Sequence, residues 1–460
     1  MNLLVSIDSK NQKIINWLNA QNQIFKIQNR IVSQIEKKNF RNARNLQRLL
    51  LKSLSAQLIA SQKFIEIEYF KDFTLYQIKK KQTFPRVLNL YNYIQFEVQL
   101  KNFNLYFNFL KILWLLALIP LHETYSDSFC YNFRLYRDHT DVLKEVVIKL
   151  KNLKINWMLI IKPNGFLNLE NKQWLINNLL VEKKFLFTLF NQKQLANQLT
   201  KEYKYKREFI ETKKISLKKI FKNYSLQGYN TSQKTFHKIK EKNLNKSPHL
   251  SIIFYNNLLL IPSTNSTQMI FRYRSIFKFL KTRGLSIKKN RIWALNLKDG
   301  FTFLGFFFKK QNNNFSITIS EQNIRSHKME LKKFLKLGRA LSIDNAIYQL
   351  NRKIYNWQIY YAYASNLKKT WSEMNHYLFW RIWRWSKKKH KNKGSKWVYK
   401  RYWAPKTSTK WVFHFNDQYL RSYNLKKQKI AHLPASINAC KTKNAKEIKR
   451  IILQKHTISK

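Results

Sequence analysis

The stretch SIIFYNNLLLI at residues 251–261 places two apolar runs on either side of a polar pair, Asn256 and Asn257. Two apolar runs separated by a short polar tip are typical of a β-hairpin. On its C-terminal side, residues 266–284 have the pattern of a basic amphipathic helix that ends at a glycine, and FTFLGFFF at 301–308 has that of a strand with a central glycine. The sequence therefore predicts a hairpin whose tip carries two uncharged amides.

The composition is strongly basic. The chain of 460 residues carries 87 Lys and Arg against 24 Asp and Glu, a formal net charge of +63. Self-repulsion of this size disfavours a compact chain in isolation, so we expect a polyanionic partner, either nucleic acid or an anionic membrane. A hydrophobic content of 44% and an aromatic content of 15% support a large core, divided over about two to four domains, and argue against a disordered basic tail. A basic, aromatic-rich globular protein predicts nucleic-acid binding.

The most apolar stretch is FNLYFNFLKILWLLALIPLHE at residues 103–123. Asn104, Asn108 and Lys111 interrupt it and Pro120 closes it, so the uninterrupted apolar part is too short to span a bilayer. We predict a buried core helix here and no membrane insertion. The N-terminal sequence MNLLVSIDSKNQKIINW has no basic segment followed by an apolar core, and so does not resemble a signal peptide.

Cys130 and Cys440 are the only cysteines of the chain, and they are too far apart in sequence to suggest a local zinc site. We predict two reduced thiols and no metal site. Four histidines of the C-terminal region show no metal-ligand spacing either: His376, His390, His414 and His432.

Several separated segments, taken in order, resemble the reverse transcriptase and maturase proteins encoded by group II introns. Residues 28–53, QNRIVSQIEKKNFRNARNLQRLLLKS, resemble the opening motif of that family, a helical pair with an LQ-LL-S core. Residues 113–143 resemble its fingers segment. The signature aromatic and arginine positions of that segment fall on Tyr131, Phe133, Arg134 and Arg137.

Two further segments resemble parts of the palm of the family. SLQGYNTSQ at residues 225–233 is similar to the proline-glutamine-glycine loop of the family, with Gln227, Gly228 and Ser232 kept. Residues 284–308 resemble the last palm segment, whose FLGF sequence is intact here. The shared order and spacing of the segments are more specific than any one of them.

The resemblance allows the catalytic positions of a polymerase to be checked. The family holds two metal ions for phosphoryl transfer with three aspartates, one after a tryptophan-containing strand and two at the hairpin. The stretch after Trp157 aligns through Gly165, which places the first position on Lys162 and the pair on Asn256 and Asn257. A lysine repels Mg²⁺ and asparagine ligates hard cations weakly. No Asp-Asp pair occurs in the chain, so the resemblance implies a degenerate palm and we predict no catalytic residue.

The resemblance is closest over residues 350–403, which are similar to the maturase (X) domain, the helical thumb of the family. Its first helix motif falls on Leu350, Asn351, Ile354, Trp357, Tyr360 and Tyr361, and its second block on Trp380, Trp383, Arg384, Trp385, His390, Lys396, Trp397 and Tyr402. Residues 409–434 resemble the segment that follows the thumb. No cysteine-pair pattern of an endonuclease follows, so DNA cleavage is not predicted.

The thumb region also predicts RNA binding from its residues alone. Seven of the thirteen tryptophans lie between residues 371 and 411, and residues 384–410 carry eleven Lys or Arg and no Asp or Glu. Basic side chains contact phosphates and exposed aromatic rings stack on unpaired bases, although we expect most of these tryptophans, including Trp380 and Trp383, to be core residues. The predicted RNA-binding residues are Arg30, Arg41, Arg44, Arg48, Arg134, Arg137, Arg384, Lys387, Lys388, Lys389, Lys391, Lys393, Lys396, Trp397, Lys400 and Arg401.

We therefore expect an α+β protein: degenerate reverse-transcriptase-like fingers and palm at residues 1–325, a helical thumb or maturase X domain at 326–405, and a basic C-terminal extension without endonuclease at 406–460. The predicted function is to bind structured group II (or derived) intron RNA and to assist its folding and splicing. The resemblance implies no cofactor of the protein, since Mg²⁺ would serve the intron RNA, and no small-molecule substrate.

Two alternatives remain open: an active RNA-directed DNA polymerase of a mobile intron, and a general basic RNA-binding protein. Lys, Asn, Ile and Phe are abundant while Gly and Pro number seven each, a bias that suits an A+T-rich organellar genome. We expect the protein to act in a plastid (chloroplast), with the mitochondrion as second choice. The oligomeric state does not follow from the sequence.

Overall fold

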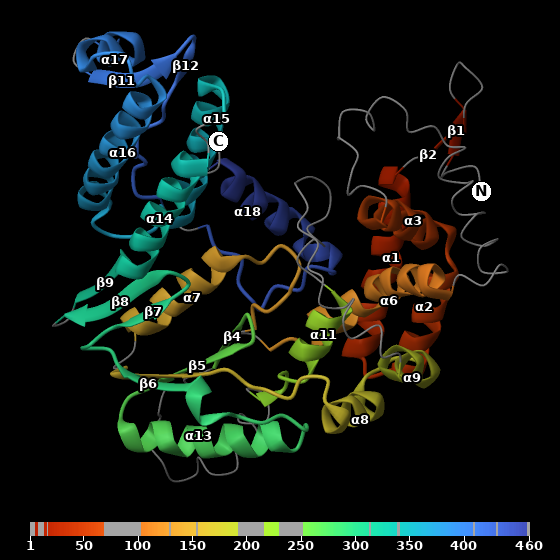
Figure 1. The fold of residues 1–460 in the computed structure, drawn as a ribbon. Helices are drawn as coiled ribbons and strands as arrows, with labels where there is room; N and C mark the ends of the chain where they lie inside the picture. The colour runs from red at the N-terminus through yellow and green to blue at the C-terminus, as the bar shows by residue number, and fades with distance from the viewer. Residues whose placement is uncertain are drawn as a thin grey trace. The chain divides into compact units, whose positions relative to one another are not determined.

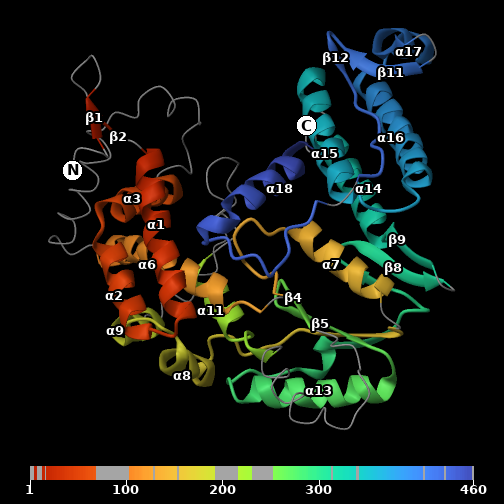
Figure 2. The ribbon, with the colours of Figure 1, turned by 180° about the vertical axis from the view of Figure 1, so that it is seen from behind.

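The computed structural model describes residues 5–7, 13–15, 17–68, 103–127, 130–152, 155–191, 216–229, 252–311, 314–337, 341–407, 410–428 and 431–457. The fold mixes helices and strands, which confirms the predicted α+β class (Figure 1; Figure 2). The chain divides into two compact units. Unit 1 comprises residues 1–142, 159–293 and 433–452, and unit 2 comprises residues 143–158, 294–432 and 453–460.

Unit 1 begins with strands β1 (Val5–Ile7) and β2 (Lys13–Ile15), which pair antiparallel. The helices that follow are α1 (Trp17–Glu36), α2 (Phe40–Lys52), α3 (Leu54–Glu68) and α6 (Phe103–Tyr125). They pack against one another because each presents an apolar stripe, and in α1 the stripe at helical spacing includes Ala20, Ile24, Ile31 and Ile35. Smaller helices complete this core: α8 (Leu169–Asn178), α9 (Lys183–Asn191) and α11 (Leu217–Tyr224).

Helix α6 is the predicted core helix, and its residues from Leu116 to Leu121 are all buried. It differs from the prediction in one respect, because Pro120 lies inside the helix and does not end it. A proline lacks the N–H that would bond the carbonyl four residues earlier. Gln28 of α1 replaces that donor: its side-chain amide donates to the Leu116 carbonyl at 2.8 Å. In the described part of the chain, no helix has the length and apolarity needed to cross a membrane.

Unit 1 also contains most of a four-stranded sheet of order β4-β5-β3-β6. Its strands are β3 (Trp157–Ile161), β4 (Ile253–Tyr255), β5 (Leu258–Ser263) and β6 (Ile292–Asn296). Helix α13 (Ser266–Lys281) packs on β5 and buries Ile276 and Leu280 in the core under the sheet (Figure 1). The helix ends as predicted before Gly284, which has a positive φ of +65°.

The predicted hairpin at residues 251–261 is confirmed over its described residues. Strands β4 and β5 pair antiparallel with Tyr255 opposite Leu258, so Asn256 and Asn257 are the two residues of the turn. Ser232, part of the predicted loop at 225–233, lies outside the described residues. Its neighbours within that loop, Gln227 and Gly228, are described.

The predicted single strand at residues 301–308 is wrong in one respect, because the sequence turns back on itself there. Strands β7 (Phe301–Phe303) and β8 (Phe306–Gln311) form a hairpin, and β9 (Asn314–Ile319) adds the third strand. Leu304 and Gly305 form the turn, with φ of 53° and 81°. A two-residue turn with two positive φ angles matches the twist of the strands it joins. The central glycine therefore marks a turn and not a flexible point in a strand.

Unit 2 also contains the helices of the predicted thumb: α14 (Glu321–Leu337), α15 (Ile343–Tyr361), α16 (Leu367–Lys389) and α17 (Ser395–Tyr402). Its core is aromatic. The ring of Trp357 stacks on His327 with centroids 4.4 Å apart and packs edge-on against Trp371 at 5.6 Å. Strands β10 (Trp403–Thr407), β11 (Lys410–Phe415) and β12 (Gln418–Tyr419) form an antiparallel sheet beside α17.

The remaining elements are α7 (His139–Asn152), the single turns η2 (Lys289–Arg291) and η4 (Thr442–Asn444), and α18 (Ala445–Thr457). The last segment of the chain is divided between the two units. Residues 433–452 return to unit 1, where Leu433, Cys440 and Ile448 are buried in its helical core. The prediction of a single C-terminal extension at residues 406–460 did not include this return.

Replacing Gly305 by alanine will destabilise the protein by about 3 kcal/mol, because a Cβ there meets a positive φ and the Tyr361 hydroxyl. Chemical denaturation followed by circular dichroism measures the loss. Gly394→Ala is the matched control in the same unit, since its φ is −67° and no atom lies within 4 Å of its added Cβ. We expect the control to cost less than about 1 kcal/mol. Equal losses in the two variants would contradict the role assigned to the turn.

Candidate functional site

The three positions predicted to align with polymerase aspartates lie at the ends of neighbouring strands of one sheet. Lys162 directly follows β3, its side chain is exposed, and its backbone N–H donates to the Arg291 carbonyl at 3.0 Å. Asn256 and Asn257 form the tip of the β4–β5 hairpin, and β5 is the neighbour of β3. Among the described residues, no group of three or more His, Cys, Asp or Glu side chains is placed to hold a metal ion.

The asparagines of the hairpin tip have a conformational role. Their φ angles are 48° and 62°, in the left-handed region that asparagine and aspartate tolerate better than other side chains. Asn256 is exposed, while the side-chain oxygen of Asn257 is buried without a hydrogen-bond partner in the described structure. An Asp-Asp pair would suit the same turn, so the backbone geometry is compatible with either pair and only the charge differs.

The fingers residues predicted to bind RNA form an exposed basic face. Arg30 lies on α1, and Arg41, Arg44 and Arg48 recur along α2, all with exposed side chains. Asn39 caps α2 by accepting a bond from the Asn42 N–H at 3.2 Å. Arg48 lies 3.6 Å from Glu182, but both side chains are more than half exposed, so this pair is weak and leaves the guanidinium accessible.

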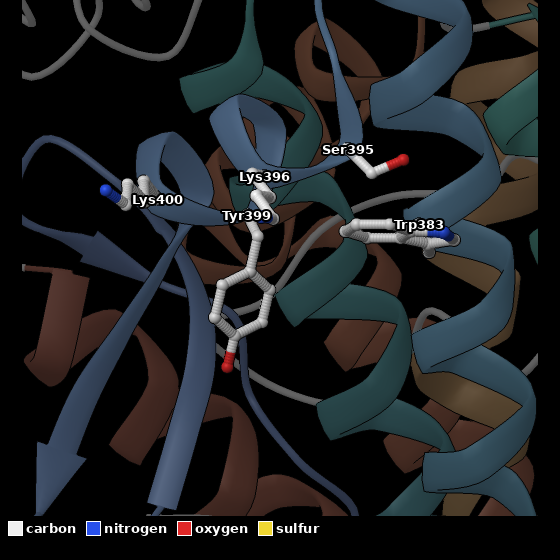
Figure 3. Close-up of a pocket in the computed structure, with 5 residues that line it drawn as sticks. All are labelled: Trp383, Ser395, Lys396, Tyr399 and Lys400. Atoms are coloured by element: carbon white, nitrogen blue, oxygen red, sulfur yellow. The ribbon is translucent and has the colours of Figure 1, made fainter.

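The thumb residues predicted to bind RNA gather on the end of α16, on α17 and on the turn between them. Eight of these basic residues are exposed: Arg384, Lys387, Lys388, Lys391, Lys393, Lys396, Lys400 and Arg401. Figure 3 shows Lys396 and Lys400 projecting from α17. Lys389 differs, because its ammonium group donates to the Leu341 carbonyl at 2.6 Å and is held within the protein.

The tryptophans of the thumb divide between core and surface. Trp371, Trp385 and Trp403 are buried, as expected for a helical domain that needs its own core. Trp380 and Trp397 are 45% and 40% exposed. The exposure of Trp380 contradicts its prediction as a core residue. The i, i+3 spacing suggested one shared face with Trp383, but the apolar stripe of α16 runs instead through Met374, Leu378, Ile382 and Trp385.

Two aromatic rings of this region, exposed Trp397 and half-buried Trp383, have basic side chains over their faces. The Lys393 ammonium lies 5.6 Å from the centroid of Trp397, and that of Lys387 lies 6.0 Å from Trp383. Tyr399 and Phe379 are also exposed, and they were not among the predicted RNA-binding residues. The only sequence signal for them was their position among Lys and Arg. The surface combines cations and open ring faces, as binding sites for single-stranded nucleic acid do.

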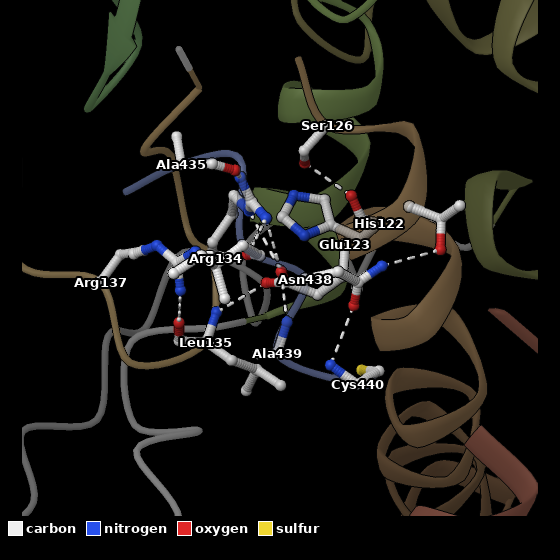
Figure 4. A network of polar contacts seen from close by, with 12 residues as sticks. His122, Glu123, Ser126, Arg134, Leu135, Arg137, Ala435, Asn438, Ala439 and Cys440 are labelled. Atoms are coloured by element: carbon white, nitrogen blue, oxygen red, sulfur yellow. Dashed lines mark hydrogen bonds and ion pairs between the residues drawn. The ribbon is translucent and has the colours of Figure 1, made fainter. Parts of the chain in front are cut away.

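Arg134 and Arg137 do not lie at this or any other surface. Arg134 forms an ion pair with Glu123 at 2.8 Å, and their side chains are 1% and 0% exposed. Arg134 also donates to the carbonyl of Ala435 (Figure 4) and to that of Ile437. Arg137 donates to the Pro434 carbonyl at 2.7 Å and to that of Ile437. This corrects the prediction of an RNA-binding surface at both arginines, because their guanidinium groups are hydrogen-bonded inside the protein.

Glu123 is the centre of this polar network. One of its oxygens accepts the Leu135 N–H at 2.9 Å and the other accepts both bonds from Arg134. Burial by itself raises the pKa of Glu123, but the charges of Arg134 and Arg137 outweigh it and lower the pKa to about 2. The neighbouring His122 has its pKa lowered to about 4, chiefly by burial, and is neutral at physiological pH. The network therefore holds residues 434–439 against α6 by a charged carboxylate.

The two cysteines lie beside this network; both are free, as predicted, and both are buried. Burial raises the pKa of the Cys130 thiol to about 12 and that of Cys440 well above its usual value. Cys130 donates to the Asn223 side-chain oxygen at 3.0 Å. Both thiols are therefore protonated packing groups with little nucleophilic character.

Comparison with known proteins assigns a class to the two parts that carry the exposed basic faces. Residues 324–403 match the group II intron, maturase-specific domain, and residues 13–68 match the N-terminal domain of reverse transcriptase. The chain thus contains both parts, which confirms the resemblance to the maturase and reverse-transcriptase family of group II introns.

Two relatives have the same name. The chain is 26% identical to the ribosomal operon-associated A protein of Euglena longa over 421 residues, which cover 87% of this chain and 76% of that protein. It is 25% identical to the ribosomal operon-associated A protein of Euglena gracilis over 159 residues, which cover 31% and 30% of the two chains.

Replacing Glu123 by glutamine will destabilise the protein by roughly 3 kcal/mol at neutral pH, because it leaves the Arg134 charge buried without its partner. The folded-state pKa of Glu123, about 2, lies below the ordinary 4.5. Its stabilisation is therefore complete above about pH 4.5 and is lost as the pH falls towards 2. The stability difference between the wild type and Glu123→Gln should shrink over that range, as measured by denaturant titration at each pH.

Glu182→Gln is the matched control, because it removes a carboxylate from an exposed glutamate–arginine pair of the same unit. We expect it to change stability by no more than about 0.5 kcal/mol. A Glu123→Gln variant as stable as this control would contradict the role given to the buried pair.

Proposed function

We propose that this protein is an intron maturase, which binds structured group II (or derived) intron RNA and assists its folding and splicing. The observation that carries the proposal is the match of residues 324–403 to the maturase-specific domain, together with the exposed cations and rings of α16 and α17 in that segment. The basic face of α1 and α2 adds a second cationic surface within the match to the reverse-transcriptase N-terminal domain. Both surfaces suit phosphate contact.

The mechanism needs no catalytic residue of the protein. In this proposal the intron RNA performs the transesterifications with its own Mg²⁺, and the protein binds the active RNA fold more tightly than misfolded forms. Such binding shifts the folding equilibrium by the ratio of the two affinities. Contacts spread over two basic faces would favour an RNA that presents phosphates to both.

We further propose that the polymerase activity of the family is lost. The supporting observation is the set of side chains at the three aligned positions, one lysine and two amides. These residues do not fit a pair of divalent metal ions, because ammonium repels them and neutral amides bind them weakly. The hairpin and its sheet then remain as a structural frame without polymerase chemistry.

A plastid location is part of the proposal. It is supported by the A+T-type amino-acid bias and by relatives from two Euglena species. The competing hypothesis, a general basic RNA-binding protein, rests on the net charge of +63, which attracts any RNA. Competition at or above about 150 mM salt separates the two, because binding by phosphate contacts alone weakens steeply there.

Wild-type protein should accelerate splicing of a precursor that contains its group II intron at moderate Mg²⁺, measured as spliced product over time. A variant with Arg384, Lys388, Lys391 and Lys393 all changed to glutamine should bind that RNA more weakly. Its dependence of log affinity on log salt should become less steep by about 0.9 for each phosphate that is no longer neutralised. Its splicing rate should fall at protein concentrations where the wild type is saturating.

The matched control changes four exposed cations elsewhere to glutamine, Lys443, Lys446, Lys449 and Arg450, and so removes the same charge. If the two variants weaken binding equally, only net charge matters and the general RNA-binding hypothesis gains. Splicing that is equal with and without wild-type protein would overturn the proposed function.

Primer extension on an RNA template tests the polymerase alternative. We expect no product above background with Mg²⁺ or Mn²⁺, because Lys162, Asn256 and Asn257 supply no carboxylate. A reverse transcriptase with intact aspartates is the positive control on the same template. Extended product from the wild-type chain would establish the alternative and contradict the proposed loss of activity.

A further inference from the structure

A shallow pocket opens on the thumb beside α16 and α17. It has a volume of about 310 Å³ and is lined by Trp383, Ser395, Lys396, Tyr399 and Lys400. Figure 3 shows the rings of Trp383 and Tyr399 on two sides of the space, with Ser395 near Trp383. The volume is at the lower end of the roughly 300–1,000 Å³ typical of small-ligand pockets. The pocket therefore has room for one small planar group and none for a double helix.

The aromatic sides of the pocket are held in place by one buried residue. Trp403 is 4% exposed, and Tyr399 stacks on it with centroids 5.8 Å apart and an angle of 7° between the rings. Trp383 packs against Trp403 at 5.3 Å and 64°. Each of the two rings uses one side for this contact and remains partly open to solvent. Fixed rings lose little conformational freedom on binding, so stacking on them is not offset by a large entropic cost.

The lining of the pocket is almost entirely apolar, and the polar groups available to a ligand lie next to it, at the first turn of α17. Gly394 caps this helix without a side-chain hydrogen bond, so the first-turn N–H groups receive no acceptor from the cap. Ser395 adds a hydroxyl and Lys396 an ammonium group, and neither is buried. A helix N-terminus with a cation beside it favours a phosphate group. Lys400 contributes its carbon chain, and its ammonium group points away from Trp383 (Figure 3).

We propose that this pocket binds a single unpaired nucleotide of RNA, with its base against Trp383 and Tyr399 and its phosphate at Ser395 and Lys396. The proposal rests on the proposed function, since it names the RNA element that the thumb selects. Unpaired bases expose their faces for stacking, whereas the faces of paired bases are covered by their neighbours in the helix. The pocket therefore selects a bulged or looped nucleotide within a structured RNA, while the cations around it contact the flanking backbone.

A free mononucleotide also carries a base and a phosphate. The test therefore compares a free mononucleotide with an unpaired nucleotide within an RNA strand. The probe is a short single-stranded RNA with 2-aminopurine, a fluorescent base that is quenched when it stacks on an aromatic ring. With full-length wild-type protein we expect quenching on binding, and much less for the same strand annealed to its complement. Adenosine monophosphate should compete only weakly, because it lacks the flanking phosphates. Competition by the free nucleotide as strong as by the oligonucleotide would overturn the assignment to RNA.

Tyr399→Ala and Trp383→Leu should each weaken binding of the probe about tenfold and reduce the quenching, since one base stacked on a ring contributes roughly 1–3 kcal/mol. Tyr399→Phe keeps the ring and should restore both, which distinguishes stacking from a general loss of packing. Lys396→Gln should weaken binding and lower its salt dependence by about one phosphate contact while the quenching at saturation stays unchanged. Circular dichroism confirms that each variant is folded.

Tyr348→Ala is the matched control, because Tyr348 is an exposed aromatic residue of α15 that does not line the pocket. It should bind the probe as the wild type does. Unchanged affinity and quenching in Tyr399→Ala and Trp383→Leu would overturn the pocket assignment and leave the maturase function standing. If the wild-type protein quenches the probe but does not accelerate splicing, the pocket assignment stands and the maturase function is overturned.

Discussion

The ion pair between Glu123 and Arg134 is the interaction on which unit 1 depends. It joins three segments that are distant in sequence: the end of α6, the loop at residues 130–137, and residues 434–439 near the end of the chain. A buried carboxylate is costly unless it is paired and hydrogen-bonded, and Glu123 satisfies both conditions. Acidic residues are scarce in this chain. Glu123 contributes more to the stability of unit 1 as the buried partner of Arg134 than it would on the surface.

The choice of rings for the core of the thumb decides which aromatic rings remain exposed. In the thumb, the buried rings of Trp371, Trp385 and Trp403 build the core, and the rings next to them are the ones that remain open. The pocket beside α17 is an example, because its exposed rings are fixed by contact with buried Trp403. The core and the pocket therefore share the same aromatic cluster in this part of the chain.

Much of the fold could be predicted from local pattern, and the differences arise where distant segments meet. The core helix α6 and the hairpin at 251–261 follow from periodicity and turn residues, and the helical pair at 28–53 follows from the family resemblance. The burial of Arg134 and Arg137 did not, because the backbone carbonyls that accept their hydrogen bonds lie about 300 residues later in the chain. The same applies to Pro120, whose place inside a helix depends on Gln28 of another helix. In the thumb, the basic run predicted the exposed cations, whereas the open ring of Tyr399 required the fold of α17 on Trp403.

The return of residues 433–452 to unit 1 has a consequence for biosynthesis. Unit 1 is discontinuous, and unit 2 includes the long insertion from residue 294 to residue 432. During translation, where folding begins at the N-terminal end, the thumb can complete its aromatic core before unit 1 receives the segment that pairs with Arg134 and Arg137. At that stage the nascent chain has a folded basic thumb, while unit 1 still lacks residues 433–452.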